Sequence, residues 1–211
     1  MNTRVYTVHI MNKKQKENAA TLSILEAIEN KEDVTQRHIA NRLDVALGLA
    51  NLYLKRCANK GLIKITQAPA NRYLYYLTPK GFSEKSRLTG EYLTSSFNFY
   101  RNAGDSLNEV FEICKKNNWE RILLCGKSEL AEIASIRASE KKITIVGTVD
   151  KKSKQSFFLG FPMWESIDDA DEFDACIITS LEDPFEIYTE TTNNYQSEKI
   201  LVPSILGIKK S

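Results

Sequence analysis

A helical segment in the first half of the chain carries side chains that could pair with a polyanion. Within residues 46–61, apolar residues recur at intervals of three and four, which predicts a helix with one buried face. On the opposite face, Asn51 could pair with adenine through two hydrogen bonds, and Lys55 could pair with a phosphate. Gly61 is the expected end of this helix. The expected buried residues are Leu47, Ala50, Leu54 and Cys57.

A shorter helix is predicted just upstream, over residues 35–43, with Thr35 as its N-cap and a turn at Asp44 and Val45. Two short helices joined by a tight turn are typical of the helix-turn-helix, whose second helix enters the major groove of DNA. Two strands are predicted at residues 62–66 and 73–77. The loop between them contains Arg72, and together they form the expected wing.

This winged helix-turn-helix predicts a domain that binds double-stranded DNA. The alternative is a winged helix used only for protein contacts. A side chain in the recognition helix would read a base, whereas cations on the helix and the wing would meet phosphates. The expected DNA-binding residues are Thr35, Gln36, Arg37, Gly48, Asn51, Leu52, Lys55 and Arg72.

A family resemblance rests on the stretches VTQRHIANRLDVALGLANLYLKRCANKGLIKI and NRYLYYLTPKGFSEKSRLTGEYLTSSFNFY. They resemble the MarR-type winged-helix regulators, and most closely the branch associated with bacterial exopolysaccharide gene clusters. The pieces KGLIKI and YLTPKG are the most specific. The resemblance covers about residues 15–103 and implies a bacterial transcription regulator, but it says nothing about the second half.

Helices are predicted on both sides of this unit. Residues 13–30 should pack behind the helix-turn-helix, and residues 5–10 could form a strand or an ordered arm. Thr78 and Pro79 open a helix that runs to about residue 103, since threonine caps and proline suits the first helical position. This helix has more aromatic residues than one small domain needs. Packing on a second subunit or on the next domain, rather than on its own chain alone, is expected through Tyr92, Phe97 and Tyr100.

Gly104 and Asp105 mark the predicted boundary between two domains, residues 1–104 and 105–211. Ser106 and Glu109 match a capping box at the start of a further helix. Apolar strands then alternate with helices, which predicts a parallel sheet with helices on both faces. We therefore expect an α/β protein of two domains, a winged helix-turn-helix followed by a Rossmann-like sheet. The strands are expected at residues 121–125, 143–149, 175–179 and 199–202, and the helices at 128–139 and 183–193.

In such a sheet, ligands bind beyond the carboxyl ends of the strands. Gly126 follows the first strand and fits the first glycine of a dinucleotide motif, but Ser128 replaces the middle glycine. Glu129 adds a negative charge that opposes a pyrophosphate, so a single phosphate or a neutral sugar ring is easier to place. Asp150 could accept from a sugar hydroxyl or could be a turn residue. The expected ligand-binding residues are Gly126, Lys127, Ser128, Asp150, Thr179 and Ser180.

A second resemblance rests on RILLCGKSELAEIA, KITIVGTVD and FLGFPMWESIDDADEFDACIITS. These stretches are similar to the nucleotide-sugar-binding domain of bacterial sugar acyltransferases. They are also similar, more loosely, to the NAD(H)-binding half of Rex-type redox repressors, which share the order of winged helix and Rossmann domain. The resemblance implies a nucleotide sugar or NAD(H) as ligand, while the incomplete glycine motif leaves a ligand-free docking module open. Its most specific residues are Gly147, Asp150, Gly160, Phe161 and Pro162.

Composition limits the class of protein. Residues 1–104 carry 16 lysines and arginines against 8 acidic residues, whereas residues 105–211 carry 13 against 19, so only the first half is expected to meet a polyanion. The 4 cysteines stand singly in apolar contexts and the chain has 2 histidines, so no metal site is expected. Single buried thiols fit a reducing cytoplasm, and no apolar run approaches the roughly 20 residues that span a bilayer.

The sequence thus predicts a cytoplasmic, bacterial transcription regulator that binds specific DNA as a homodimer. Its second domain is expected to sense a nucleotide sugar or another phosphorylated metabolite, or to bind a partner. An enzyme acting on nucleotide sugars is one alternative. The second half has no histidine and no paired carboxylates for catalysis, which leaves only lysine or tyrosine chemistry at Lys127 or Tyr188. A ligand-free interaction scaffold is the other alternative.

Overall fold

The computed structural model describes residues 13–30, 34–69 and 72–208. The strand or arm expected at residues 5–10 lies outside these described residues. The chain forms two compact units that divide between Ser96 and Phe97. Both units receive part of one long helix, α4 (Pro79–Lys116).

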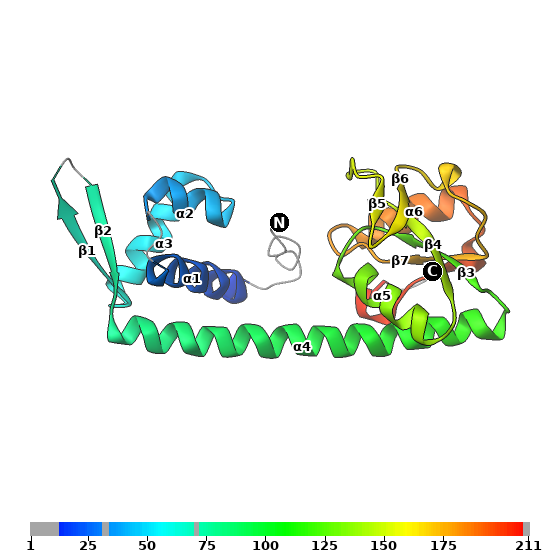
Figure 1. Ribbon diagram of the computed structural model, residues 1–211, viewed down its shortest axis with the longest axis horizontal. Helices are drawn as coiled ribbons and strands as arrows, with labels where there is room; N and C mark the ends of the chain where they lie inside the picture. The colour runs from blue at the N-terminus through cyan, green and yellow to red at the C-terminus, as the bar shows by residue number, and fades with distance from the viewer. Residues whose placement is uncertain (1–12, 31–33, 70–71, 209–211) are drawn as a thin grey trace. The chain divides into compact units, whose positions relative to one another are not determined.

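The first unit has the element order expected of a winged helix-turn-helix (Figure 1). Its two strands pair antiparallel, with Ile63 opposite Leu77 and Ala68 opposite Arg72, so each is slightly longer than the sequence predicts. The start of α4 completes the unit. The other elements are α1 (Lys13–Glu29), α2 (Gln36–Leu43), α3 (Leu47–Asn59), β1 (Ile63–Ala68) and β2 (Arg72–Leu77).

Local signals end and begin these elements as the sequence predicts. The Thr35 hydroxyl accepts from the backbone N–H of His38 and caps α2, and Asp44 ends α2 in the left-handed region at φ 52°. The Thr78 hydroxyl accepts from the N–H of Gly81 and so caps α4. A Cβ at Gly81 would lie 2.1 Å from the Leu62 carbonyl oxygen, so only glycine allows this close contact between helix and wing.

The core of this unit confirms most of the predicted buried face of α3. Ala50, Leu54 and Cys57 pack with buried residues of α1, α2 and β1. Leu47 was expected to be buried but is 47% exposed. It is the first residue of α3, where the helix has not yet reached the core. The residues contributed by the other elements are Ile24, Leu25, Ala27, Ile28, Ile39, Ala40, Leu62 and Ile63.

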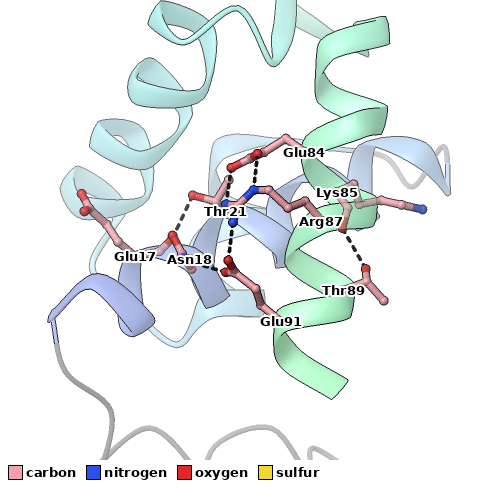
Figure 2. Close-up of polar contacts among 8 residues, drawn as sticks. All are labelled: Glu17, Asn18, Thr21, Glu84, Lys85, Arg87, Thr89 and Glu91. Atoms are coloured by element: carbon pink, nitrogen blue, oxygen red, sulfur yellow. Dashed lines mark hydrogen bonds and ion pairs between the residues drawn. The ribbon is translucent and has the colours of Figure 1, made fainter. Parts of the chain in front are cut away.

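Polar contacts fasten α1 to the first turns of α4. Figure 2 shows Asn18 of α1, whose amide donates to the Glu91 carboxylate of α4 at 3.2 Å. Within α4, Arg87 pairs with both Glu84 and Glu91. Lys85 of α4 also forms an ion pair with Glu29 of α1. Exposed ion pairs contribute little each, so the buried apolar contacts provide most of the stability.

The second unit is built on a six-stranded mixed sheet of order β5-β6-β4-β3-β7-β8. The neighbours from β6 to β8 pair parallel, and only β5 runs antiparallel to β6. Four of the strands and both helices were predicted close to their observed bounds. The elements are β3 (Arg121–Cys125), α5 (Glu129–Glu140), β4 (Thr144–Val149), β5 (Phe157–Phe158), β6 (Phe161–Trp164), β7 (Ala175–Ile178), α6 (Pro184–Asn194) and β8 (Ile200–Leu201).

The β5–β6 hairpin was not predicted. Its turn is Leu159 and Gly160, both in the left-handed region at φ 54° and 82°. Each of its strands is shorter than the alternating pattern needed to identify a strand from sequence.

Two apolar layers cover the two faces of this sheet. On one face, α5 and the last turns of α4 pack on Ile122, Leu124 and Ile145. On the other face, Ile187 and Tyr188 of α6 pack beside Cys125 and Cys176. The prediction of a sheet with helices on both faces is therefore confirmed, with a mixed rather than wholly parallel sheet.

Helix α4 runs through Gly104 without a break, so the predicted helix stop at this glycine is wrong. A Cβ at Gly104 would lie 2.9 Å from a guanidinium nitrogen of Arg137, so the glycine makes room for the side chain of a neighbouring helix. The predicted capping box is also wrong. The Ser106 hydroxyl accepts from the N–H of Ile205, and Ser204 contacts both Ser106 and Glu109, so these residues hold the end of the chain.

Within the described residues, no helix has an apolar stretch long enough to cross a membrane.

Candidate functional site

The residues proposed to contact DNA divide into exposed groups and groups that serve the fold. Arg37, Gly48, Leu52, Lys55 and Arg72 are exposed. Thr35 is exposed as well, but its hydroxyl is the cap of α2. The Gln36 side chain hydrogen-bonds with the Tyr75 hydroxyl, which lowers the Tyr75 pKa while the larger effect of burial raises it. Gln36 therefore ties α2 to the wing.

Asn51 does not present its whole amide to solvent. The residue is half-buried, and its Oδ1 atom is buried without a hydrogen-bond partner. With about 3.6 residues per turn, Gly48 and Leu52 fall opposite the buried row of Ala50 and Leu54, whereas Leu49 and Asn51 fall on the two flanks of the helix. Asn51 therefore lies at the edge of the outer face rather than at its centre.

Four exposed cations lie on the helices and wing of the same unit: Arg37 on α2, Lys55 on α3, Lys64 on β1 and Arg72 on β2. None of them pairs with a carboxylate among the described residues. Two further arginines are engaged, since Arg56 pairs with Glu17 and Arg42 lies 3.7 Å from Glu26. Lys64 was missed by the sequence interpretation, although the alternation along β1 placed it on the face away from Ile63.

The wing also exposes large side chains. Tyr73, Leu74 and Tyr76 of β2 are 49%, 44% and 51% exposed, although they lie in a strand. Sequence reasoning named only Arg72 here. The signal was available, because an RYLYYL strand on a two-stranded sheet cannot bury all of its aromatic side chains.

The residues proposed to bind a ligand meet at the carboxyl edge of the sheet in the second unit. Gly126 follows β3, Asp150 follows β4 and Thr179 follows β7, and β3 lies between β4 and β7. After β3, the chain first adds β4, β5 and β6 on one side of β3 in the strand order, and it then crosses over to add β7 and β8 on the other side. In a sheet of this kind, that is the position at which ligands bind.

The polar groups at this edge hydrogen-bond with one another. The two oxygens of Asp150 accept from the backbone N–H groups of Lys127 and Lys152, each at 2.9 Å. The Ser128 hydroxyl caps α5 by accepting from Leu130 and Ala131, and it donates to the Thr179 carbonyl. Asp150 and Ser128 thus stabilise turns, which was the structural alternative considered for Asp150.

Gly126 packs closely against the turn that follows β7. Its φ is +108°, and a Cβ would lie 2.5 Å from the backbone nitrogen of Ser180. The Thr179 hydroxyl donates to the Gly126 carbonyl at 2.6 Å and holds the two turns together. The glycine is therefore required by this contact between turns.

The loop between β4 and β5 forms ion pairs and a hydrogen bond with other segments at the same edge of the sheet. Lys152 pairs with Asp183 at 2.7 Å and Lys151 pairs with Glu190 at 2.7 Å, both at or within α6. The Lys127 ammonium donates to Gln155 at 2.6 Å and lies 5.6 Å from the Phe158 ring centroid. These contacts are exposed and individually weak.

A hollow of about 350 Å³ lies at the opposite, amino edge of the sheet, lined by Arg121, Tyr195 and the acidic segment 171–174. Two of its polar side chains are engaged in the fold. Asp174 accepts from the backbone N–H groups of Glu120 and Arg121, and Arg121 Nε donates to the Glu172 carbonyl. The sequence interpretation named none of the residues that line this hollow.

Residues 17–64 match the family of winged helix-turn-helix DNA-binding domains. The matched segment runs from α1 through α2 and α3 to the start of β1, and it contains Arg37, Lys55 and Lys64. The first unit is therefore a winged helix-turn-helix domain. A comparison with curated proteins found no match.

Three solved structures are similar to this chain at low identity. The zinc-responsive MarR family member ZitR of Lactococcus lactis is 19% identical over 53% of this chain and 80% of its own, with a TM-score of 0.34. Human N-acetylserotonin methyltransferase in complex with SAM is 14% identical over 78% of this chain and 66% of its own, with a TM-score of 0.32. PigF with SAH is 12% identical over 90% of this chain and 56% of its own, with a TM-score of 0.24. Scores of this size do not establish a shared overall fold.

Proposed function

We propose that the protein is a bacterial, cytoplasmic transcription regulator of the MarR type that binds duplex DNA through its winged helix-turn-helix. The match of residues 17–64 to a DNA-binding family carries this proposal. The exposed cations of α2, α3 and the wing support it, because each is free to pair with a phosphate. Phosphate contacts supply much of the affinity of such domains and make it dependent on salt.

The test is a mobility-shift assay with duplex DNA from upstream of the protein's own gene, repeated at several salt concentrations. Lys55→Ala should weaken binding to all sequences alike and reduce the salt slope by about 1. Lys116→Ala is the matched control, since it removes an exposed lysine from the other unit. Retention of full affinity and salt slope by Lys55→Ala would exclude α3 from the interface, and a wild-type protein that binds no duplex would contradict the function itself.

We propose that the regulator is a homodimer, formed through α4. Tyr92, Leu93 and Phe97 of this helix are 41%, 47% and 58% exposed, which is unusual for large apolar side chains on one helix. Tyr100 lies 5.9 Å from the Arg137 guanidinium carbon, so it has a partner on its own chain and is a weaker candidate. A dimer would place two recognition helices one DNA turn, roughly 34–36 Å, or a multiple of it apart.

Light scattering at micromolar concentration tests the assembly. The wild type should have twice the mass of the chain, and Phe97→Asp should shift it towards the monomer because a charge would enter the apolar contact. Phe185→Asp is the matched control, since Phe185 is 67% exposed on α6. A wild-type monomer, with or without DNA, would exclude this proposal.

For the second unit we propose a Rossmann-like sensor domain whose ligand, a nucleotide sugar or a related phosphorylated metabolite, binds at the carboxyl edge near Gly126, Lys127 and Ser180. The position at the switch between β3 and β7 supports it. NAD(H) is the second candidate. The Asp150, Ser128 and Thr179 side chains are engaged by backbone groups of neighbouring turns, which favours a different role, a ligand-free docking module.

Thermal-shift measurements separate these roles. A ligand at 100 times its Kd stabilises the native state by about 2.7 kcal/mol, which raises the Tm measurably. UDP-sugars, NAD(H), NADP(H), CoA and nucleoside phosphates are the probes. A rise that is lost in Lys127→Met, but kept in Lys141→Met on the far end of α5, would support the sensor. The absence of any shift would support the docking module.

A further inference from the structure

The outer face of the first two turns of α3 is apolar. Leu49 and Leu52 are 40% and 43% exposed and lie about one turn apart, with Leu52 opposite the buried row of the helix and Leu49 on its flank. Gly48 lies beside them, and a Cβ built on it would meet no atom within 4 Å. A flat apolar surface of this kind allows another molecule to approach the helix closely.

The first two turns of α3 have few side chains that can form hydrogen bonds. Between Leu47 and Leu54, only Asn51 and Tyr53 have polar side chains. The amide oxygen of Asn51 is buried, and Tyr53 is half-buried with its ring 6.0 Å from the guanidinium carbon of Arg56. The part of a recognition helix that enters the groove is its N-terminal part. In this protein that part can make mainly apolar contacts.

The charges around the leucines indicate what covers them. Lys55 follows one turn after Leu52, and Arg37, Lys64 and Arg72 are exposed on α2 and the wing, without carboxylate partners among the described residues. A domain that exposes both an apolar surface and unpaired cations is complementary to a polyanion that carries apolar groups. In the major groove, the C5 methyl of thymine is the apolar group on the base edges.

We propose that Leu49 and Leu52 read thymine methyl groups in the major groove, so that the bases under α3 in the binding site are rich in A·T pairs. This inference rests on the proposed DNA-binding function. It assigns specificity to these leucines and phosphate binding to the cations. Asn51, expected from the sequence to read adenine, has no part in it.

The experiment begins with selection of tight sites from a random duplex library by the full-length protein. Thymines in the selected site are then replaced one at a time by deoxyuridine, which pairs identically but lacks the methyl group. Burying one methyl group corresponds to about a fourfold change in affinity. Wild-type protein should therefore lose about fourfold at each thymine under α3 and nothing at thymines elsewhere in the site.

The variants complete a double-mutant cycle. Leu52→Ala and Leu49→Ala should each bind the thymine duplex more weakly, and each should lose the difference between thymine and deoxyuridine at one position. Ile136→Ala, which truncates a side chain that is 50% exposed on α5, is the matched control and should behave as wild type. Both leucines are exposed, so circular dichroism should show unchanged folding.

The outcomes separate the inference from the function on which it rests. Equal binding of thymine and deoxyuridine duplexes by a protein that still selects a site would overturn the reading of methyl groups and leave DNA binding intact. Selection of G·C-rich sites would overturn it as well. A protein that binds no duplex at all would remove both proposals.

Discussion

The amide oxygen of Asn51 lies buried in α3 with no hydrogen-bond partner. An unsatisfied buried polar group costs about 1–3 kcal/mol, and alanine also has the higher helix propensity. We expect Asn51→Ala to stabilise the domain by about 1 kcal/mol in urea unfolding, with DNA affinity close to that of wild type.

A loss of DNA affinity in Asn51→Ala would mean that this side chain contacts DNA. If Asn51 rotates out to pair with adenine on binding, Asn51→Ala should lose roughly 1–3 kcal/mol of DNA affinity and tolerate other bases at one position. This is what the sequence alone predicts. Measurement of stability and affinity on the same variant therefore decides between the two roles.

Glu129, in the first turn of α5, is a second half-buried group with an unsatisfied oxygen. Burial raises the pKa of its carboxyl above the ordinary value of 4.5. Because the folded state then holds the proton more tightly than the unfolded state, this group favours folding below its ordinary pKa and loses that effect as pH rises through the raised value.

Glu129→Gln should consequently raise the Tm at pH 7 and change it little at pH 4, where the carboxyl is already protonated. Glu186→Gln, at an exposed glutamate in the first turn of α6, is the matched control and should not show this dependence. A Glu129→Gln variant with the same change in Tm at both pH values would contradict the argument.

The sequence identified most of the residues at the candidate sites but not the direction of every side chain. The residues of the carboxyl edge were predicted because parallel strands bring their ends to one edge whatever their side chains do. Asn51 and Gln36 are half-buried, because a rotation of a fraction of a helical turn, or one hydrogen bond to Tyr75, decides whether an amide faces solvent.

At the scale of elements, Gly126 and Gly90 differ in whether the structure has room for a side chain. At Gly126 the φ of +108° and the 2.5 Å approach to Ser180 leave no room for a side chain. Gly90 lies in the interior of α4, exposed, with nothing within 4 Å of a Cβ.

We expect Gly126→Ala to destabilise the second unit by more than about 2 kcal/mol. Gly90→Ala should stabilise α4 by up to about 1 kcal/mol, because alanine restricts the unfolded chain and favours the helix. Urea unfolding of the two variants beside wild type checks both signs. A tolerated Gly126→Ala would mean that the turn and Ser180 move apart easily.

Elements were predictable where periodicity and capping agreed, as in α2, α3 and the start of α4. They were not predictable where a distant side chain decided the outcome. Gly104 reads as a helix stop in sequence, but the helix continues through it, and Ala103 and Leu107 on either side are buried in the core of the second unit. Local propensity is overridden by such tertiary contacts.

At the scale of the whole molecule, the uneven charge indicated two parts with different partners. The division between the compact units falls inside α4, between Ser96 and Phe97, and therefore leaves no break in secondary structure to be found in the sequence. A domain boundary within a continuous helix has no turn residues to mark it.

The burial of all four cysteines gives the protein a built-in readout of unfolding. Burial raises the pKa of Cys57 to about 11 and that of Cys114 to about 12, so almost no reactive thiolate forms at pH 8. Native protein should leave a thiol reagent colourless, and denatured protein should react at all four sites.

The positions of these thiols make the readout specific. Cys57 belongs to the first compact unit, whereas Cys114, Cys125 and Cys176 belong to the second, and each unit has its own buried core. With rising urea, pulsed labelling followed by mass spectrometry should show two separate steps, of one and of three modified cysteines. Modification of all four at a single urea concentration would mean that the halves open together, and either result requires no engineered label.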